Sequence, residues 1–215
     1  YLRQKYHVVI ANPPYMGGKS MNGRLSVFAK DNFPDSKSDL FAMFMERIFQ
    51  LIMKLGYNGM VTMQSWMFLS SYEKLRGKLL SNLSIVSMAH MENMVMGIAF
   101  GTSATVFTKF PDEQRLGAYC HIEYSDLGEN NAPLKFPPTN SRNSTSNSKN
   151  NLIWVSPHDY QKIPGSPIAY WASEALKKVF SNLPSLGSKL NSRIALATGN
   201  NDLFIREWYE IEKNS

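Results

Sequence analysis

The residues best suited to do chemistry are the tetrapeptide Asn12-Pro13-Pro14-Tyr15, which directly follows the apolar run 6–11. The side-chain carbonyl of Asn12 and the backbone carbonyl of Pro13 can each accept one N–H bond of a planar amine. Because proline fixes φ and carries no N–H, the two prolines make a rigid turn that leaves the Pro13 carbonyl uncaptured. Tyr15 offers a flat face for stacking. The four residues suit a site that holds an exocyclic amine and favours its reaction, although an ordinary proline-rich turn has the same composition.

Composition limits the classes of protein to be considered. The 215 residues are 43% hydrophobic, which is typical of a globular chain with one sizeable core or one domain with an appendage. Lysine and arginine number 23 against 17 acidic residues, so the net charge of +6 suits a polyanionic partner. Cys120 is the only cysteine, which excludes an internal disulfide and a cysteine-based zinc cluster. No apolar stretch has the length of a membrane span, so we expect a cytoplasmic protein with no membrane partner.

The first quarter of the chain predicts a strand, a loop and a helix. Residues 6–11 are apolar without alternation, which indicates a parallel strand buried on both faces. Residues 16–37 are rich in Gly, Ser, Asn and Lys and predict a long loop beside the tetrapeptide. Ser38 can cap a helix over residues 39–55, which Gly56 ends. The wide apolar face of that helix is typical of a helix that packs against a sheet.

The following segments predict further strands and one more helix. The capping-box sequence Ser-Ser-Tyr-Glu at residues 70–73 predicts a helix that ends near residue 81 or 82. The last two strands are separated by a turn-forming segment and can pair as a hairpin. The order of elements predicts an α/β sheet that finishes in antiparallel strands. The predicted strands cover residues 59–64, 85–89, 102–110 and 118–124.

Cationic side chains and histidines give weaker signals. Lys74, Arg76 and Lys78 lie on the predicted helix and could reach phosphates, but three cations on a surface helix are more typical of a solvated face. The four histidines lack the spacing of metal ligands, so we expect them to be structural and expect no metal site. They are His7, His90, His121 and His158.

Composition changes again in the last third of the chain. Residues 128–151 are rich in Asn, Ser, Pro and Lys and predict a flexible surface excursion that marks a boundary. Residues 152–215 return to a globular composition, with a short helix expected over residues 173–180.

In these motifs the chain resembles N6-adenine-specific DNA methyltransferases of the large type II and phage-exclusion (BREX) kind. The tetrapeptide is the most specific match, and further matching segments follow along nearly the whole chain. These are Asp39-Leu40-Phe41, the strand from Gly59, the Gly-Thr-Ser-Ala-Thr strand from Gly101, residues 163–171, and the Ala-Thr-Gly-Asn-Asn stretch from Ala197.

The resemblance implies a Rossmann-like sheet and S-adenosylmethionine as the methyl donor. It implies that Asn12 and the Pro13 carbonyl hold the adenine N6, that Pro14 helps to fix the turn, and that Tyr15 stacks on the flipped base. Phe100 is a candidate for a second aromatic contact with that base. The implied partners are double-stranded DNA with a flipped adenine and proteins of a restriction-modification or phage-defence system.

One feature of such enzymes is missing, namely a strand with a Gly-rich donor loop upstream of the catalytic turn. Gly17-Gly18 comes after the turn and lacks the strand-loop-helix setting, and neither Asp31 nor Asp35 is an obvious substitute for the acidic residue that binds the donor's ribose. We therefore expect a fragment that binds the donor poorly by itself and is inactive in isolation. Its expected parts are the later half of the catalytic domain over residues 1–127, the excursion over 128–151, and an extension toward a target-recognition region over 152–215.

Two alternatives remain open at the level of sequence. The same tetrapeptide serves RNA N6-adenine and protein glutamine methyltransferases, because their substrates also present a planar amine. A different class of protein is a non-catalytic DNA-binding or assembly module in which the catalytic turn is inherited without use.

Overall fold

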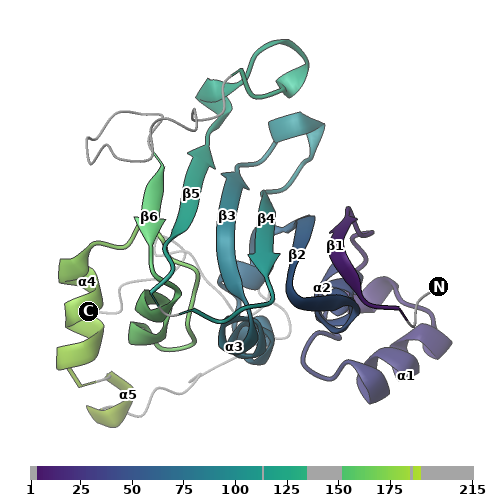
Figure 1. Cartoon of the computed structure of the whole chain (residues 1–215), viewed down its shortest axis with the longest axis horizontal. Coiled ribbons are helices and arrows are strands. Elements are labelled where there is room, and N and C mark those ends of the chain that lie inside the picture. The colour runs from purple at the N-terminus through teal and green to yellow at the C-terminus, as the bar shows by residue number, and fades with distance from the viewer. Residues whose placement is uncertain (1–3, 113, 135–151, 185, 190–215) are drawn as a thin grey trace, which may run out of the picture. The chain divides into compact units, whose positions relative to one another are not determined.

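The structure is a computed structural model that describes most of the chain. The described residues are 4–112, 114–134, 152–184 and 186–189. Contacts between residues divide the chain into two compact units, 1–181 and 182–215, and the first of them contains the sheet shown in Figure 1. In the second unit the described residues form the short helix α5 (Leu186–Lys189). The first unit crosses the limits at 127/128 and 151/152 that composition suggested, whereas the Ala197 stretch lies outside the described residues.

A six-stranded mixed sheet with the order β1-β2-β4-β3-β5-β6 organises the first unit. Strands β1, β2, β3 and β5 run in one direction, and β4 and β6 run in the other. The predicted sheet with late antiparallel strands is therefore present. The strands are β1 (Tyr6–Ala11), β2 (Ile52–Met63), β3 (Ser84–Met91), β4 (Thr102–Thr108), β5 (Gly117–Ile122) and β6 (Ile153–Val155).

The predicted hairpin of the last two strands before the excursion is wrong. Strand β4 lies between β2 and β3 and pairs antiparallel with both, while β5 pairs parallel with β3. Thr102 and Thr108 at the two ends of β4 each align with residues of both neighbouring strands, so backbone groups on both edges of β4 are paired along its length. A hairpin with β5 would pair only one of those edges.

Strand β1 is present, but its predicted burial on both faces is wrong. It is an edge strand with one partner, and the side chains of Val8 and Ile10 are 55% and 82% exposed. The apolar run indicated a covered strand because the sequence pattern does not show how many neighbours a strand has.

The predicted loop over residues 16–37 contains helix α1 (Gly23–Asn32). The Asn22 side chain caps this helix by accepting a hydrogen bond from the Leu25 backbone N–H at 2.9 Å. The polar composition of the segment predicted a loop instead. The helix is stabilised locally by its N-cap and by the contact between the Phe28 and Phe33 rings.

Helix α2 (Leu40–Leu51) is capped by Asp39 rather than by Ser38, because an Asp39 carboxylate oxygen accepts from the Phe41 N–H at 3.2 Å. It ends four residues earlier than predicted, where β2 begins. Gly56 does not end a helix but lies inside β2. A Cβ atom there would come within 2.9 Å of the His7 carbonyl oxygen, so the close approach of β1 requires glycine.

Helix α3 (Glu73–Asn82) ends where the sequence predicts, although the expected capping-box hydrogen bonds are not formed among the described residues. Of its three cations, Lys78 pairs with Asp35 at 2.5 Å and with Glu46 at 3.0 Å. Arg76 is only 1% exposed, so it belongs neither to a solvated face nor to a phosphate-binding surface. Its guanidinium donates instead to the backbone carbonyl oxygens of Trp66, Leu69 and Gly165.

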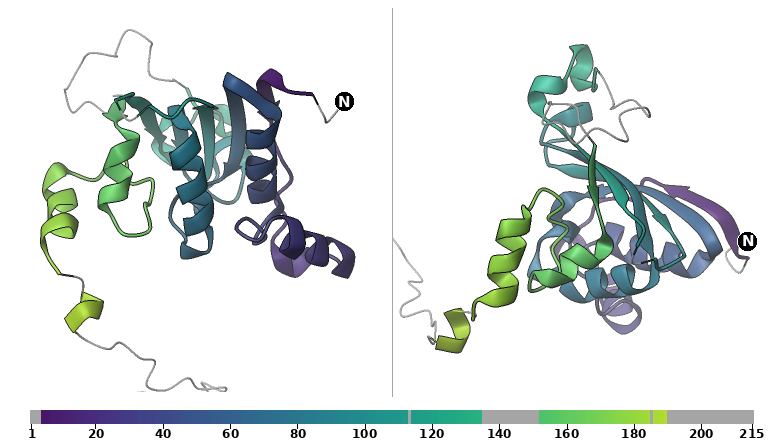
Figure 2. Two further views of the ribbon diagram at one scale, coloured as in Figure 1. Left: turned by 60° about the horizontal axis from the view of Figure 1, so that its bottom comes forward. Right: turned by 60° about the vertical axis from the view of Figure 1, so that its left-hand side comes forward.

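Helices α2 and α3 cover one face of the sheet (Figure 2). The main core lies between these helices and the sheet, and it includes Phe41, Leu75, Met88 and Tyr119. Among the described residues, no helix is both long and apolar enough to cross a bilayer. Short 3-10 turns complete the path of the chain: η1 (Gly18–Ser20), η2 (Gln64–Met67), η3 (Ser70–Tyr72), η4 (Val95–Gly97), η5 (Tyr124–Asp126), η6 (Glu129–Asn131) and η8 (Pro157–Lys162).

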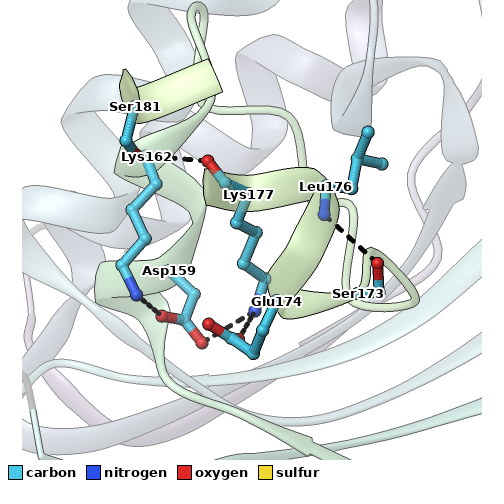
Figure 3. Close-up of polar contacts among 7 residues, drawn as sticks. All are labelled: Asp159, Lys162, Ser173, Glu174, Leu176, Lys177 and Ser181. Atoms are coloured by element: carbon cyan, nitrogen blue, oxygen red, sulfur yellow. Dashed lines mark hydrogen bonds and ion pairs between the residues drawn. The ribbon is translucent and has the colours of Figure 1, made fainter. Parts of the chain in front are cut away.

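Helix α4 (Glu174–Asn182) confirms the short helix predicted near residues 173–180. Its Lys177 is 4% exposed and pairs with Asp159 at 2.9 Å and with Glu174 at 2.8 Å (Figure 3). Burial by itself would raise the pKa of Asp159, but hydrogen bonds from Lys162 and Lys177 lower it. This cluster ties α4 to η8, so these two elements are held together within the first unit.

Candidate active site

All four strands that run in one direction end at the same edge of the sheet, and the candidate residues gather there. Asn12 follows β1, Gln64 follows β2, and Phe100 shortly precedes β4, which starts at this edge. The strand registers keep these ends level, because the last residues of β2 and of β3 both align with Thr102. In open α/β sheets, ligands bind outside the carboxyl ends of the strands.

The tetrapeptide forms a turn in which one acceptor group is exposed and the other has no hydrogen-bond donor among the described residues. Asn12 is exposed, while Pro13 is buried and fixes the backbone behind it. Among the described residues none donates a hydrogen bond to the Pro13 carbonyl. The Tyr15 hydroxyl lies 3.4 Å from the Asn12 side-chain oxygen and 3.3 Å from the Val61 carbonyl oxygen, to either of which it can donate. The turn therefore places an exposed amide side chain and a backbone carbonyl without a donor among the described residues side by side at the end of β1.

The structure brings Phe100 beside Tyr15. In the sequence Phe100 follows Asn12, the first residue of the turn, by 88 residues. The two rings meet edge to face with centroids 5.4 Å apart, and Phe41 contacts Tyr15 in the same manner at 6.1 Å. Burial raises the pKa of the Tyr15 phenol, which keeps its hydroxyl proton in place. The contact of these rings with a base stays a prediction, but their mutual packing fixes how Tyr15 is oriented.

Asp39 holds the chain that leaves the turn. Its carboxylate accepts from the Met16 N–H at 3.0 Å as well as from Phe41, and the Leu40 N–H donates to the Met16 carbonyl at 3.0 Å. The start of α2 is thereby joined to the residue directly after Tyr15. Sequence reasoning matched Asp39-Leu40-Phe41 to the family without assigning this positioning role, which depends on a contact across 23 residues.

A buried network at the same edge joins the end of β2 to β3. The His90 Nε2–H donates to the Gln64 side-chain oxygen at 2.5 Å, and the Tyr170 hydroxyl donates to His90 Nδ1 at 3.0 Å. These directions follow because the Gln64 oxygen can only accept. Burial, and secondarily the neighbouring His121, lower the pKa of His90 to about 4, so the ring is neutral near pH 7. The network links β2, β3 and the 163–171 segment.

The lowered pKa of His90 predicts a pH-dependent stability. Between about pH 6.5 and pH 4 the unfolded chain binds a proton at this position and the folded chain does not, so the free energy of unfolding falls as the pH falls. The decrease should reach at most roughly 3 kcal/mol. Thermal unfolding followed by circular dichroism at pH 7 and pH 4.5 measures it. His90→Gln should flatten the dependence, whereas the exposed His7→Gln should not; equal slopes in both variants would contradict the assignment.

Gly101 lets the Gln64 side chain reach His90. A Cβ atom at position 101 would overlap the Gln64 side-chain amide, and the Gln64 N–H also donates to the Gly101 carbonyl at 3.0 Å. Gly101→Ala should therefore displace Gln64 from His90 and destabilise the fold by about 1 kcal/mol, the usual value of one hydrogen bond. Chemical unfolding measures this difference. In a Gln64→Ala background the added alanine should cost almost nothing, and an undiminished cost there would exclude the proposed overlap.

The remaining predicted features lie away from the turn's acceptors. Gly17 forms a bridge with Asp39, the N-cap of α2, and Asp35 pairs with Lys78 of α3, so both have structural partners. Among the described residues, no group of three or more His, Cys, Asp or Glu side chains is arranged to hold a metal ion. Of the acidic residues near the turn, Asp35 pairs with Lys78 and Asp39 accepts from the Met16 N–H.

Sequence comparison identifies relatives along the whole chain. A family model for Eco57I restriction-modification methylases matches residues 1–95. The chain is 44% identical over 214 residues to adenine-specific methyltransferase BrxX of Escherichia coli O9:H4 (strain HS) and 35% identical over 216 residues to adenine-specific methyltransferase PglX of Lacticaseibacillus casei (strain Zhang). These alignments cover 100% and 98% of this chain but 17% and 18% of the two relatives, so the chain spans less than a fifth of their length.

Structure comparison supports the same fold class. A modification subunit assigned to a type I restriction enzyme of Vibrio vulnificus matches 82% of this chain and 37% of its own with a TM-score of 0.53. A chain from a study of the assembly of a type I restriction-modification system matches 87% of this chain and 42% of its own with a TM-score of 0.57. Both are 16% identical, so they show the fold alone, and the predicted Rossmann-like α/β class is confirmed. Over its whole length the chain is a homologue of one segment of the adenine-specific methyltransferases BrxX and PglX, as its motifs indicated.

Proposed function

We propose that the longer protein containing this chain transfers a methyl group from S-adenosylmethionine to the N6 amino group of adenine in DNA, in restriction-modification or phage defence. The observation that carries the proposal is the pair of acceptors at the carboxyl edge of the sheet: the exposed Asn12 side chain and the Pro13 carbonyl, which accepts no hydrogen bond from the described residues. The similarity to BrxX and PglX supports adenine as the substrate base.

In this proposal Asn12 and Pro13 bind the two N–H bonds of the adenine amine. Both acceptors draw the hydrogens toward the protein, which localises the nitrogen lone pair and directs it at an electrophile. S-adenosylmethionine supplies the electrophilic methyl group when bound. The S–CH3 bond of the donor would break as the N6–CH3 bond forms, leaving S-adenosylhomocysteine, and the methylated amine would then lose its extra proton to water. No side chain needs to act as a general base, because alignment and polarisation of the amine provide the acceleration.

Tyr15 and Phe100 form the aromatic side of the proposed base site. The adenine must leave the duplex to reach Asn12, and a ring extruded in this way is stabilised by stacking. Tyr15 is held by Phe41 and Phe100, so its face is oriented before a base arrives. The phenol keeps its proton, because burial raises the pKa of Tyr15, and it can orient the Asn12 amide from 3.4 Å.

The cofactor and the partners follow from the same proposal. We assign no residue of this chain to S-adenosylmethionine, since the acidic side chains near the turn have other partners. The proposed substrate is double-stranded DNA, and the proposed location is the cytoplasm. Proteins of a defence system are the proposed binding partners. The net charge of +6 suits the DNA substrate.

The test compares substrates that present a planar amine. The full-length protein is incubated with methyl-labelled S-adenosylmethionine and with duplex DNA, RNA or a glutamine-containing peptide, and the products are identified by mass spectrometry. We expect N6-methyladenine in DNA only. Methylation of RNA or of glutamine instead would replace the proposed substrate, and no transfer to any of the three would favour a non-catalytic module.

A further inference from the structure

A polar pocket of about 630 Å³ opens at the carboxyl ends of β2, β3 and β5. The pocket lies at the same edge of the sheet as Asn12. Phe100 and Gly101 connect the two sites, because Phe100 contacts Tyr15 of the turn and Gly101 lies against Gln64 of the pocket wall. Three strand spacings separate β1 from β3, which is about 14 Å. The pocket is lined by Gln64, His90, Glu92, Asn93, His121 and Tyr124.

The floor of the pocket is rigid. His90 is fixed by Gln64 and Tyr170, and the His121 ring stacks on it with centroids 4.9 Å apart and an interplanar angle of 27°. Trp171 stacks on the His90 ring as well. The pocket therefore has a preformed flat wall, which lowers the entropic cost of binding a planar ligand.

The rim of the pocket is rich in acceptors. A Glu92 carboxylate oxygen lies 3.6 Å from His121 Nε2, and a Glu123 oxygen lies 4.0 Å from His121 Nδ1. The Glu92 carboxylate in the pocket lining, with the Glu123 carboxylate beyond it, disfavours a phosphate group but accepts hydrogen bonds from N–H donors. Asn93 adds an amide that can both donate and accept, and the Tyr124 ring is 63% exposed and available for stacking.

We propose that this pocket binds a second nucleobase of the DNA, one with an exocyclic amino group, while the target adenine occupies the Asn12 site. Glu92 accepts from the amino group, Asn93 contacts the remaining edge of the base, and Tyr124 stacks on its face. The inference rests on the proposed function for the presence of DNA. A separation of about 14 Å is less than half a helical turn of B-DNA, so one short stretch of DNA can reach both places. The catalytic sheet then contributes to sequence recognition by its own side chains.

The test uses the full-length protein and duplexes of about 30 base pairs, three helical turns, selected for tight binding from a random library. Single abasic sites are then placed at each position, and dissociation constants are measured by fluorescence anisotropy. We expect Glu92→Ala to weaken binding of the intact duplex by about 5- to 100-fold, the range for one good base contact. One abasic position should weaken the wild-type protein by a similar factor and should abolish the difference between wild type and variant.

Three further variants sharpen the result. Tyr124→Ala should lose binding at the same position, and Tyr124→Phe should retain it because the stacking face remains. Glu129→Gln removes a charge from an exposed site on η6 outside the pocket and should not show the positional effect. Both the Glu92 and the Tyr124 positions are exposed enough for substitution without unfolding. The Glu92 side chain is 45% exposed, and Tyr124 is 63% exposed.

Other outcomes overturn the proposal. If Glu92→Ala binds every duplex with the wild-type constant, or loses the same factor on every abasic duplex, the pocket does not hold a base. These measurements need no methyl transfer, so they separate the two proposals. Methylation that depends on Asn12 without positional coupling at Glu92 rejects only the pocket, whereas positional coupling without methylation rejects only the proposed reaction.

Discussion

Replacing Asn12 with alanine is expected to lower the rate of methyl transfer by the full-length protein at least 10²- to 10³-fold, with little change in DNA affinity. The range is typical for removal of one preorganised polar group that acts on the reacting atoms. The Asn12 side chain is exposed at the end of β1, so its loss leaves the core intact. Single-turnover transfer of a labelled methyl group measures the rate, and fluorescence anisotropy measures DNA binding.

A graded control separates the acceptor from mere bulk. Asn12→Asp keeps an oxygen at nearly the same place and should retain more activity than Asn12→Ala, because the adenine amine still meets an acceptor. Near-normal methylation by the alanine variant would exclude the assigned role. A parallel loss of DNA binding would instead point to a damaged turn.

Replacing Arg76 with alanine is expected to destabilise the fold by about 3–5 kcal/mol. The guanidinium donates four hydrogen bonds to three carbonyl oxygens: those of Trp66 at 2.9 Å, Leu69 at 2.7 Å, and Gly165 at 3.0 and 2.7 Å. The alanine variant removes this donor from all three carbonyls beside a new cavity, and of the three only the Leu69 carbonyl keeps a second donor among the described residues, the Tyr72 N–H at 3.1 Å. Chemical unfolding followed by circular dichroism measures the loss.

Two matched variants define what Arg76 contributes. Arg76→Lys keeps the charge but cannot serve three carbonyls in one plane, so most of the destabilisation should persist. Lys74→Ala removes an exposed cation from the same helix and should change the free energy of unfolding by less than about 0.5 kcal/mol. Equal effects at positions 74 and 76 would show that the buried hydrogen bonds contribute no net stability.

The elements that sequence predicts well are those whose signal is local. The turn at residues 12–15 carries its own rigidity in two prolines, and the end of α3 agrees with the prediction. Helix α1 was missed because its one strong signal, the Asn22 cap, lies within a polar segment. The cap of α2 was placed one residue early, because Ser38 and Asp39 are both good capping residues and only the contact with Met16 selects the second.

The features that could not be predicted depend on contacts between distant residues. Three cations on one helix look alike in sequence, but Arg76 points toward the carbonyl of Gly165, 89 residues away, and is buried. The proximity of Phe100 to Tyr15 was expected only from the resemblance, and its geometry follows from β4 lying next to β2. The link from His90 to Tyr170 spans 80 residues and has no sequence signal beyond the residue types.

The placement of β4 between β2 and β3 also determines the order in which the sheet can form during synthesis. Asn12 leaves the ribosome 88 residues before Phe100, which is roughly 4–18 s at synthesis rates of 5–20 residues per second. During that interval β2 and the nascent β3 have no strand between them to pair with, since β4 supplies the hydrogen bonds to both. The aromatic side of the candidate site is therefore completed late, when the returning strand closes the gap.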